Sequence, residues 1–306
     1  MSNKPVILVT AADLAPQAVA LLGEYEVVFA GKTPEHEDIV ALAKQHNPVG
    51  IILRYGSITP EIMDAAPALK VISKHGSGTD TIDKAAAKER GIEVTAAIGA
   101  NAAAVAEQAL ALLLACAKSI VNLNERMHEG FWDKATHKSL ELRGRTIGLI
   151  GLGAIGQRFA RMANALEMRV LGFDPYAKNV PDYVELVDLE TLWTESDAIS
   201  LHCPLTPENK TIINADSLAK CRKGLILVNT ARGGLVDEQA LLDALSCGQV
   251  SMAGLDSFAT EPFKAPHIFQ HHERLILSPH IGGVTSDAYM NMGVAAAKNL
   301  VSVVAA

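Results

Sequence analysis

Cysteine is scarce in this sequence, and long hydrophobic runs are missing. The 306 residues include four cysteines, and no two of them have the CxxC spacing typical of zinc and redox sites. No cluster of His, Cys, Asp and Glu has metal-ligand spacing, so we expect a protein of the reducing cytoplasm without disulfides or a metal. The apolar run at 109–117 is too short to span a bilayer, and the N-terminus has no signal-like apolar core.

An excess of positive charge is also missing. The chain carries 27 Lys and Arg against 34 Asp and Glu, which gives a net charge of -7. Such a chain has no general attraction for phosphate backbones, so we expect neither nucleic acid nor a membrane as a partner. Its length corresponds to about two ordinary domains, which leaves room for a cleft.

Short aliphatic runs recur along the chain, with helical stretches between them. The first series lies at 6–9, 27–29, 49–53 and 69–72, and the second at 146–150, 169–173, 198–201, 225–228 and 275–277. Runs this apolar suit parallel strands that are covered on both faces. The sequence therefore predicts an α/β protein with two doubly wound parallel-sheet (Rossmann-like) domains.

Two longer helical stretches accompany the second series. The stretch 101–128 is rich in Ala and Leu and has no internal Gly or Pro, so we expect one long helix that could join the domains. The stretch 286–304 also has a helical pattern and follows the last predicted strand, so we expect it to return to the first domain. The predicted domains are therefore a discontinuous one, 1–99 with 286–306, and a continuous one, 100–285.

A glycine-rich turn follows the first strand of the second domain. It contains Gly151, Gly153 and Gly156, with Ala154 and Ile155 between the last two, and a helical stretch begins there. The three glycines permit, in order, a tight turn, close approach of the backbone to a pyrophosphate, and close packing of helix on strand. An anion at the helix N-terminus completes the arrangement, so the turn predicts a dinucleotide site.

An acidic residue at the end of the next strand completes this motif. Asp174 lies about 20 residues after the glycines, where the ribose diol needs a hydrogen-bond acceptor. A carboxylate there repels the 2'-phosphate of NADP, and no Arg follows closely to accept that phosphate. The sequence therefore predicts NAD as the cofactor.

Three further residues are candidates for catalysis, namely Arg232, Glu261 and His280. Arg232 and His280 come just after predicted strands, at the edge where open α/β sheets bind ligands. Histidine can exchange the proton of an alcohol as hydride moves, and a neighbouring carboxylate would orient it. An arginine fork can hold a substrate carboxylate. Taken one at a time, each residue also fits a salt bridge or a helix cap.

From about residue 51 to 284 the sequence resembles the D-2-hydroxyacid dehydrogenases, which include D-3-phosphoglycerate dehydrogenases and glyoxylate/hydroxypyruvate reductases. Several motifs carry the resemblance in the family's order. They lie at 74–80, 101–128, 151–156, 202–206, 230–234, 256–262 and 278–283. The resemblance implies an NAD-dependent enzyme that moves a hydride to or from C2 of a small D-2-hydroxy acid.

The resemblance also implies roles for individual residues. Arg232 would bind substrate, His280 would be the acid/base, and Glu261 would pair with His280. Ser77 and Gly78 would offer backbone N–H groups to the substrate carboxylate. The remaining cofactor contacts that the resemblance implies are Cys203, Thr230, Ala231, Asp256, Gly282 and Gly283.

The resemblance has consequences for organisation as well. It implies that 1–99 with 286–306 binds substrate, that 100–285 binds NAD, and that the protein is a homodimer through the NAD-binding domain. Ala154 stands where many members have Arg, so one pyrophosphate contact is missing. We expect no C-terminal regulatory module of the kind that some phosphoglycerate dehydrogenases possess.

The substrate prediction depends on three basic residues, Arg54, Lys74 and Lys134. One carboxylate needs only Arg232 and the loop N–H groups, so additional cations favour an anionic acid with a second negative group. The leading candidate is 3-phosphoglycerate, and hydroxypyruvate or glyoxylate is the alternative. The same three residues also fit solvated surface charges.

Two other functions share this fold. One is an NAD(H)-sensing corepressor, which would bind the cofactor to control protein contacts. The other is formate oxidation, which is less favoured because a donor without a hydroxyl gives His280 no proton to take. Turnover of any 2-oxo acid with NADH would separate an enzyme from a corepressor.

Overall fold

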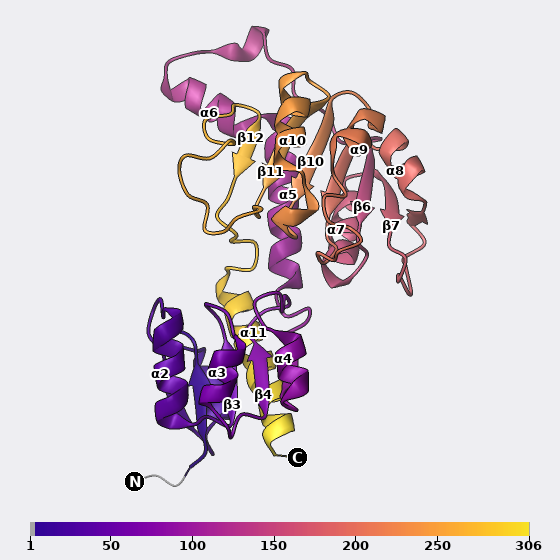
Figure 1. The fold of residues 1–306 in the computed structure, drawn as a ribbon. Coiled ribbons are helices and arrows are strands. Elements are labelled where there is room, and N and C mark those ends of the chain that lie inside the picture. Colours follow the sequence, from indigo (N-terminus) through magenta and orange to yellow (C-terminus); the bar gives the residue numbers. More distant parts are fainter. Residues whose placement is uncertain (1–3, 306) are drawn as a thin grey trace. The chain divides into compact units, whose positions relative to one another are not determined.

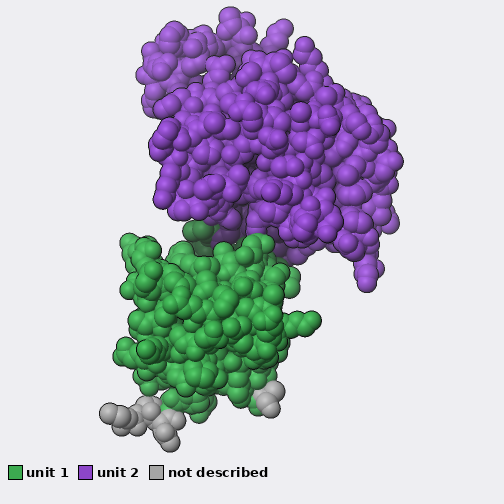
Figure 2. All heavy atoms as spheres, viewed as in Figure 1, with its two compact units in different colours: residues 1–101, 284–306 green, residues 102–283 purple. Residues whose placement is uncertain are grey.

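Two parallel sheets organise the chain in the computed structural model, which describes residues 4–305. The chain divides into unit 1, residues 1–101 and 284–306, and unit 2, residues 102–283 (Figure 2). Each unit contains one sheet with helices on both faces (Figure 1). The predicted fold of two doubly wound domains, the first of them discontinuous, is confirmed.

Unit 1 is built on a five-stranded sheet. Its strands are β1 (Val6–Val9), β2 (Glu26–Phe29), β3 (Gly50–Leu53), β4 (Val71–Lys74) and β5 (Glu93–Ala96). Its helices are α1 (Pro16–Leu21), α2 (His36–His46), α3 (Pro60–Ala65), α4 (Lys84–Glu89) and α11 (Ser286–Val304). The strand order is β2-β1-β3-β4-β5 with all neighbours parallel, so the order reverses between β1 and β3.

Both faces of the unit 1 sheet are buried, as the aliphatic runs require. On one face Ile39 of α2 packs among the side chains of α3 and α4, and on the other Ala18 and Leu300 bring α1 and α11 onto the sheet. Each large aliphatic side chain buried in this way contributes about 1.5–3 kcal/mol. A buried hydrogen bond of 2.9 Å from Ser73 Oγ to the carbonyl oxygen of Ala296 also ties α11 to β4.

Unit 2 is built on a seven-stranded sheet. Its strands are β6 (Thr146–Ile150), β7 (Arg169–Phe173), β8 (Val184–Leu186), β9 (Ala198–Leu201), β10 (Leu225–Asn229), β11 (Val250–Leu255) and β12 (Leu275–Leu277). Its helices are α5 (Ala102–Lys118), α6 (Ile120–His128), α7 (Ala154–Ala165), α8 (Leu189–Glu195), α9 (Ala215–Lys220) and α10 (Glu238–Ser246), with short 3-10 turns η1 (Asp133–Ala135) and η2 (Gly233–Leu235).

The strand order of unit 2 is that of a dinucleotide-binding sheet. The order β12-β11-β10-β9-β6-β7-β8 is parallel throughout and reverses between β6 and β9. Helices α5 and α7 cover one face, and α8, α9 and α10 cover the other. In such sheets the ligand lies beyond the carboxyl ends of the strands at the reversal, so this edge is where a site is expected.

The stretch 101–128, predicted as one helix, forms two. Helices α5 and α6 meet at 60°, and Ser119 between them has a left-handed backbone with φ 52°. The chain that returns after α6 binds the end of α5, because Leu140 N donates to Ala117 O and Lys118 Nζ donates to Leu140 O, both at 2.9 Å. This tertiary capping ends α5 where helix propensity alone predicts continuation.

Three strands lack the aliphatic run that marks the others. Strands β5 and β8 lie at sheet edges, and β5 carries Glu93 and Thr95 in place of aliphatic residues. Strand β11 lies inside the sheet but contains Ser251 and Gly254. A Cβ on Gly254 would lie 2.8 Å from Leu112 of α5, so glycine stands there to let the helix pack.

Residues 4–305 contain neither a single long apolar helix nor a cluster of metal ligands. Within that range no single helix is long and apolar enough to cross a membrane, and α5 with α6 meets the criterion of length and composition only as a bent pair. In the same described part of the chain, no group of three or more His, Cys, Asp and Glu side chains could hold a metal ion.

Candidate active site

The glycine-rich turn connects β6 to α7 in a conformation that requires glycine. Gly151 has φ +99°, and its N donates to Phe173 O at 2.9 Å. A Cβ on Gly151 would lie 2.6 Å from the backbone N of Cys203, and one on Gly156 would lie 2.1 Å from Gly151 O. Neither position tolerates a side chain without movement of the backbone, so the turn packs tightly against both α7 and the end of β9.

The N-terminus of α7 is open beside this turn. Gly153 is the N-cap residue, no side chain caps the helix, and no heavy atom lies within 4 Å of the position that a Cβ on Gly153 would take. The first helical residues, Ala154 and Ile155, therefore present backbone N–H groups that no intrahelical carbonyl accepts. Together with the helix dipole they form a cradle for a pyrophosphate, so the residues present fit a dinucleotide such as NAD.

Asp174 is held at the end of β7 by two backbone groups. Its Oδ2 accepts a hydrogen bond from Leu152 N, and its Oδ1 accepts one from Tyr176 N, both at 2.8 Å. Each carboxylate oxygen keeps a lone pair for a further donor, such as a ribose hydroxyl. The carboxylate thus also fixes the glycine-rich turn, which the sequence motif alone does not indicate.

The three residues after β10 lie at the same carboxyl edge. Asn229, the last residue of β10, orders them, since its Oδ1 accepts from Ala231 N and its Nδ2 donates to Arg232 O, both at 2.9 Å. Thr230 is buried, and its Oγ1 has no hydrogen-bond partner among the described residues. Sequence reasoning missed Asn229, although an amide at the end of an otherwise aliphatic strand is a usable indication.

His280 and Glu261 are in direct contact. His280 Nδ1 and Glu261 Oε2 are 2.6 Å apart, and Glu261 Oε1 accepts from Phe258 N at 3.0 Å. Both oxygens of the carboxylate are therefore occupied, and the imidazole is oriented by a charge-assisted hydrogen bond. Because Nδ1 faces Glu261, Nε2 is the ring nitrogen that can exchange a proton with a ligand.

The pKa values of this pair move apart. The hydrogen bond to Glu261 raises the pKa of His280 above its usual value, although burial and the charge of Arg232 oppose the rise. Burial acts to raise the pKa of Glu261, but hydrogen bonds from His280 and Phe258 N, with the charges of His280 and Arg232, hold it below its usual value. The pair therefore favours imidazolium and carboxylate, and Arg232 acts on both groups electrostatically.

Asp256 anchors the loop that carries His280. The side chain follows β11 and is 1 % exposed. Its Oδ1 accepts from Ser278 Oγ at 2.5 Å and from Ile281 N at 2.9 Å, and its Oδ2 accepts from Gly282 N at 2.7 Å. His280 lies within this loop with φ 54°, a conformation that needs such support in a residue other than glycine. Gly282 is buried and the next glycine is half-buried.

Gln108 is a second residue that sequence reasoning missed. From α5 its Nε2 donates to Ser278 Oγ at 3.1 Å, so the loop around His280 is tied to the helix as well as to Asp256. Nothing in the motif spacing marks Gln108, because it lies within an Ala- and Leu-rich helix. Its polar side chain in that apolar stretch was the available indication.

Four of the predicted substrate residues lie in unit 1, at the carboxyl edge of its sheet. Arg54 directly follows β3, Lys74 ends β4, and Ser77 and Gly78 lie in the next loop, the first exposed and the second half-buried. Lys74 Nζ donates to Arg54 O at 3.2 Å. The Arg54 guanidinium donates to Asp13, so this cation is already engaged by a carboxylate.

Lys134 lies in a different part of unit 2 from the catalytic candidates. It belongs to η1, and the adjacent Asp133 lines a hollow of about 740 Å³ together with Gly224 and Arg274. The last two residues directly precede β10 and β12, so this hollow lies at the amino edge of the sheet. Within its own chain, Lys134 is thus not brought together with the residues at the carboxyl edge. The position of Lys134 depends on the break between α5 and α6, which motif spacing does not predict.

Comparisons with known proteins address the family. A family model described as D-isomer specific 2-hydroxyacid dehydrogenase, NAD binding domain, matches residues 110–282, more than half of the chain. The chain is 40% identical over 276 residues to a hydroxypyruvate reductase of Thermotoga maritima, which covers 90% of both proteins. It is 37% identical over 299 residues to a D-3-phosphoglycerate dehydrogenase of Mycobacterium tuberculosis, which covers 97% of this chain but 56% of that relative.

The fold comparison agrees with the sequence comparison. The TT0316 protein from Thermus thermophilus superposes with a TM-score of 0.90 at 36% identity, and the match covers 98% of this chain and 97% of that one. The resemblance inferred from the motifs is confirmed. The chain belongs to the D-isomer specific 2-hydroxyacid dehydrogenases, a family of NAD-dependent oxidoreductases.

Proposed function

We propose that this protein transfers a hydride between NAD(H) and C2 of a small 2-hydroxy or 2-oxo acid. The observation that carries the proposal is the 2.6 Å contact between His280 Nδ1 and Glu261 Oε2. This contact lies at the sheet edge that also bears Arg232 and the glycine cradle. NAD(H), when bound, supplies or accepts the hydride.

The side chains handle the proton and the charge of the acid. In the direction of reduction, His280 Nε2 donates a proton to the C2 oxygen as hydride reaches C2, and the neutral imidazole then takes up a proton from solvent. Glu261 keeps its charge and stabilises the imidazolium before transfer. Arg232 binds the substrate carboxylate through two parallel hydrogen bonds. Oxidation is the reverse, with His280 as the base.

Roles for the two units follow from the same proposal. Unit 2 binds NAD through the cradle and Asp174, whose negative charge disfavours the additional phosphate of NADP. Unit 1 is the substrate-binding domain, in which the N–H groups of Ser77 and Gly78 serve the substrate carboxylate. We assign the substrate-binding domain to residues 1–99 with 286–306 and the NAD-binding domain to residues 100–285.

Two substrates are candidates. Hydroxypyruvate or glyoxylate is favoured by the engagement of Arg54 with Asp13, which removes one of the three cations on which a phosphate site was predicted. The place of Lys134 at the amino edge removes a second within the same chain. The alternative is 3-phosphoglycerate, which is favoured by Lys74 at the carboxyl edge of unit 1. Relatives carry both names.

We also propose that the protein is a homodimer through unit 2. Four large apolar side chains on α6 and the turn after it are at least half exposed, namely Ile120, Met127, Phe131 and Trp132. No residue of α6 is buried. An apolar surface of this kind is normally covered by a partner. Sedimentation of the protein and of Trp132→Ser should show a dimer that the substitution weakens, and a monomeric wild type would refute this part.

A panel of 2-oxo acids with NADH and with NADPH tests the proposed function. We expect turnover with at least one small 2-oxo acid and a preference for NADH. Tight binding of NADH without turnover of any member of the panel would instead favour a corepressor-like role, in which the cofactor controls protein contacts.

A further inference from the structure

A second cluster of charged groups lies in unit 1, apart from the acid/base pair. Asp13 belongs to the loop after β1, and Arg54 directly follows β3. These are the two strands between which the order of the unit 1 sheet reverses. Open α/β sheets bind ligands beyond the carboxyl ends of their strands at this point, so the cluster occupies a position suited to contact a substrate.

Arg54 is held from several sides. Its Nη1 donates to Asp13 Oδ1 at 2.5 Å and to Asp13 O at 2.8 Å, and its backbone N donates to Thr10 Oγ1 at 2.9 Å. The guanidinium carbon lies 4.8 Å from the ring centre of Tyr289 and 5.3 Å from that of Tyr55. The Arg54 side chain is only 13% exposed, so it is not a solvated surface charge. Most of its guanidinium faces other protein groups and not solvent.

The exposed member of the pair is the carboxylate. The Asp13 side chain is 70% exposed, and its Oδ1 also accepts from the Tyr289 hydroxyl at 2.9 Å. The hydrogen bonds from Tyr289 and Arg54 lower the pKa of Asp13, so it is ionised at neutral pH. An approaching ligand therefore meets a negative group backed by a cation.

We infer that Asp13 is a specificity-determining residue, which holds Arg54 and excludes acids that carry a second anionic group. The inference rests on the proposed function and names its substrate class, a 2-hydroxy or 2-oxo acid without a second anionic group such as a phosphate on C3. A phosphate brought to Arg54 would meet the like charge of Asp13, which disfavours it. A C3 hydroxyl meets no such repulsion and can donate to the carboxylate.

The test removes the charge of the Asp13 side chain and keeps the size of the side chain. For wild type and Asp13→Asn, kcat/KM is measured with NAD for D-glycerate and for 3-phosphoglycerate, which differ only by the phosphate. We expect wild type to favour D-glycerate, and Asp13→Asn to raise the ratio of 3-phosphoglycerate to D-glycerate by about tenfold or more. The double variant Asp13→Asn with Arg54→Met should lose that gain, because the guanidinium, no longer neutralised by a carboxylate, is its source.

Two further variants guard against indirect effects. Tyr289→Phe removes one hydrogen bond to Asp13 but keeps its charge and the ring over Arg54, so the ratio should change much less than in Asp13→Asn. Asp64→Asn is the matched control, since Asp64 also pairs with an arginine of unit 1, Arg90, at 2.7 Å and 3.0 Å, but from α3. That control should leave the ratio unchanged.

Binding and turnover are read separately. Calorimetric titration of the NAD-loaded protein with 3-phosphoglycerate should show tighter binding by Asp13→Asn than by wild type. An unchanged ratio in Asp13→Asn, a gain that survives Arg54→Met, or a wild type that prefers 3-phosphoglycerate would overturn the inference while turnover upholds the proposed function. If no variant turns over either acid, the panel of 2-oxo acids decides on the proposed function, and the titration alone decides whether Asp13 excludes the phosphate.

Discussion

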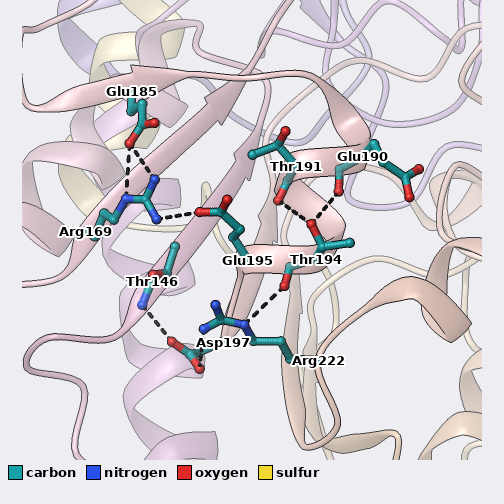
Figure 3. A network of polar contacts seen from close by, with 9 residues as sticks. All are labelled: Thr146, Arg169, Glu185, Glu190, Thr191, Thr194, Glu195, Asp197 and Arg222. Atoms are coloured by element: carbon teal, nitrogen blue, oxygen red, sulfur yellow. Dashed lines mark hydrogen bonds and ion pairs between the residues drawn. The ribbon is translucent and has the colours of Figure 1, made fainter.

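The amino and carboxyl edges of the unit 2 sheet use charged residues in different ways. At the amino edge the charges pair with one another, as Figure 3 shows. Arg169 binds Glu185 at 2.7 Å and Glu195 at 2.6 Å, and Asp197 accepts from Thr146 N at 2.8 Å and pairs with Arg222. These side chains are mostly half exposed, so each pair adds little stability.

At the carboxyl edge the charged and amide side chains are held chiefly by backbone groups. Asp174, Asn229, Asp256 and Glu261 all accept hydrogen bonds from main-chain N–H groups of the surrounding loops. Such contacts fix the loops and leave His280 Nε2 and the open N-terminus of α7 for ligands. Substitutions at this edge should therefore change chemistry and binding, and those at the amino edge should change stability slightly.

The largest expected effect is that of His280→Asn. Because proton transfer is lost and the cofactor cradle is untouched, turnover should fall by about 10²-fold or more. NADH affinity, measured by fluorescence titration, should change little. Near-normal turnover would remove His280 from the mechanism.

Substitutions of two glycines in the turn should distinguish an effect on stability from an effect on cofactor binding. Gly156→Ala places a Cβ 2.1 Å from Gly151 O, so it should lower stability by about 1–3 kcal/mol and weaken NADH binding. In Gly153→Ala the added Cβ has no heavy atom within 4 Å, so the melting temperature should be unchanged. NADH affinity should nevertheless fall by about tenfold, because the pyrophosphate needs that space. Unaltered NADH affinity in Gly153→Ala would argue against the cradle.

Asp174→Asn should reduce the preference for NADH over NADPH by about tenfold. The amide keeps one acceptor for Leu152 N or Tyr176 N and removes the charge that repels a 2'-phosphate. The ratio of kcat/KM for the two cofactors is the measurement. A wild type that uses both equally well would contradict the prediction before any variant is made.

Glu261→Gln should shift the pH dependence of the reaction rate. Reduction needs the imidazolium, so its rate falls as pH rises through the pKa of His280, which Glu261 raises. Removal of the charge should shift this limb to lower pH, and the acidic limb of oxidation should shift in the same direction. Glu238→Gln is the matched control, because Glu238 lies 3.6 Å from another histidine, His267. Identical profiles for wild type and Glu261→Gln would make Glu261 only structural.

The smallest effect is expected at the amino edge. Arg169→Gln breaks two exposed ion pairs, so the free energy of unfolding should fall by less than about 1 kcal/mol. Steady-state kinetics should be unchanged. A loss of activity with normal stability in Arg169→Gln would contradict the proposed difference between the two edges.

Motifs that lie close together in the sequence could be predicted, and partners that are distant could not. Gly151, Gly156 and Asp174 belong to one strand, turn, helix and strand unit, in which local geometry nearly determines the arrangement. Asp13 and Tyr289 reach Arg54 from opposite ends of the chain, and no spacing rule connects them. The substrate prediction was therefore the weakest part, because it counted cations without their partners.

The same limit explains the errors in the fold. The strands with continuous aliphatic runs were predicted because burial on both faces leaves a clear pattern. Helix propensity extended α5 through Ser119, although the chain near Leu140 closes its last turn. Propensity is a local quantity, and the break is decided by a segment that comes later in the chain.

The return of α11 to unit 1 has a consequence for biosynthesis. Leu300 and Ala296 cover the face of the unit 1 sheet that contains Ile52 and Val71, and they emerge from the ribosome after all of unit 2. While unit 2 is translated, only α1 therefore covers this apolar face of the first hundred residues, and the part that α11 buries is left exposed. On the nascent chain, unit 2 has its complete set of elements first, and unit 1 is closed last, by the final helix.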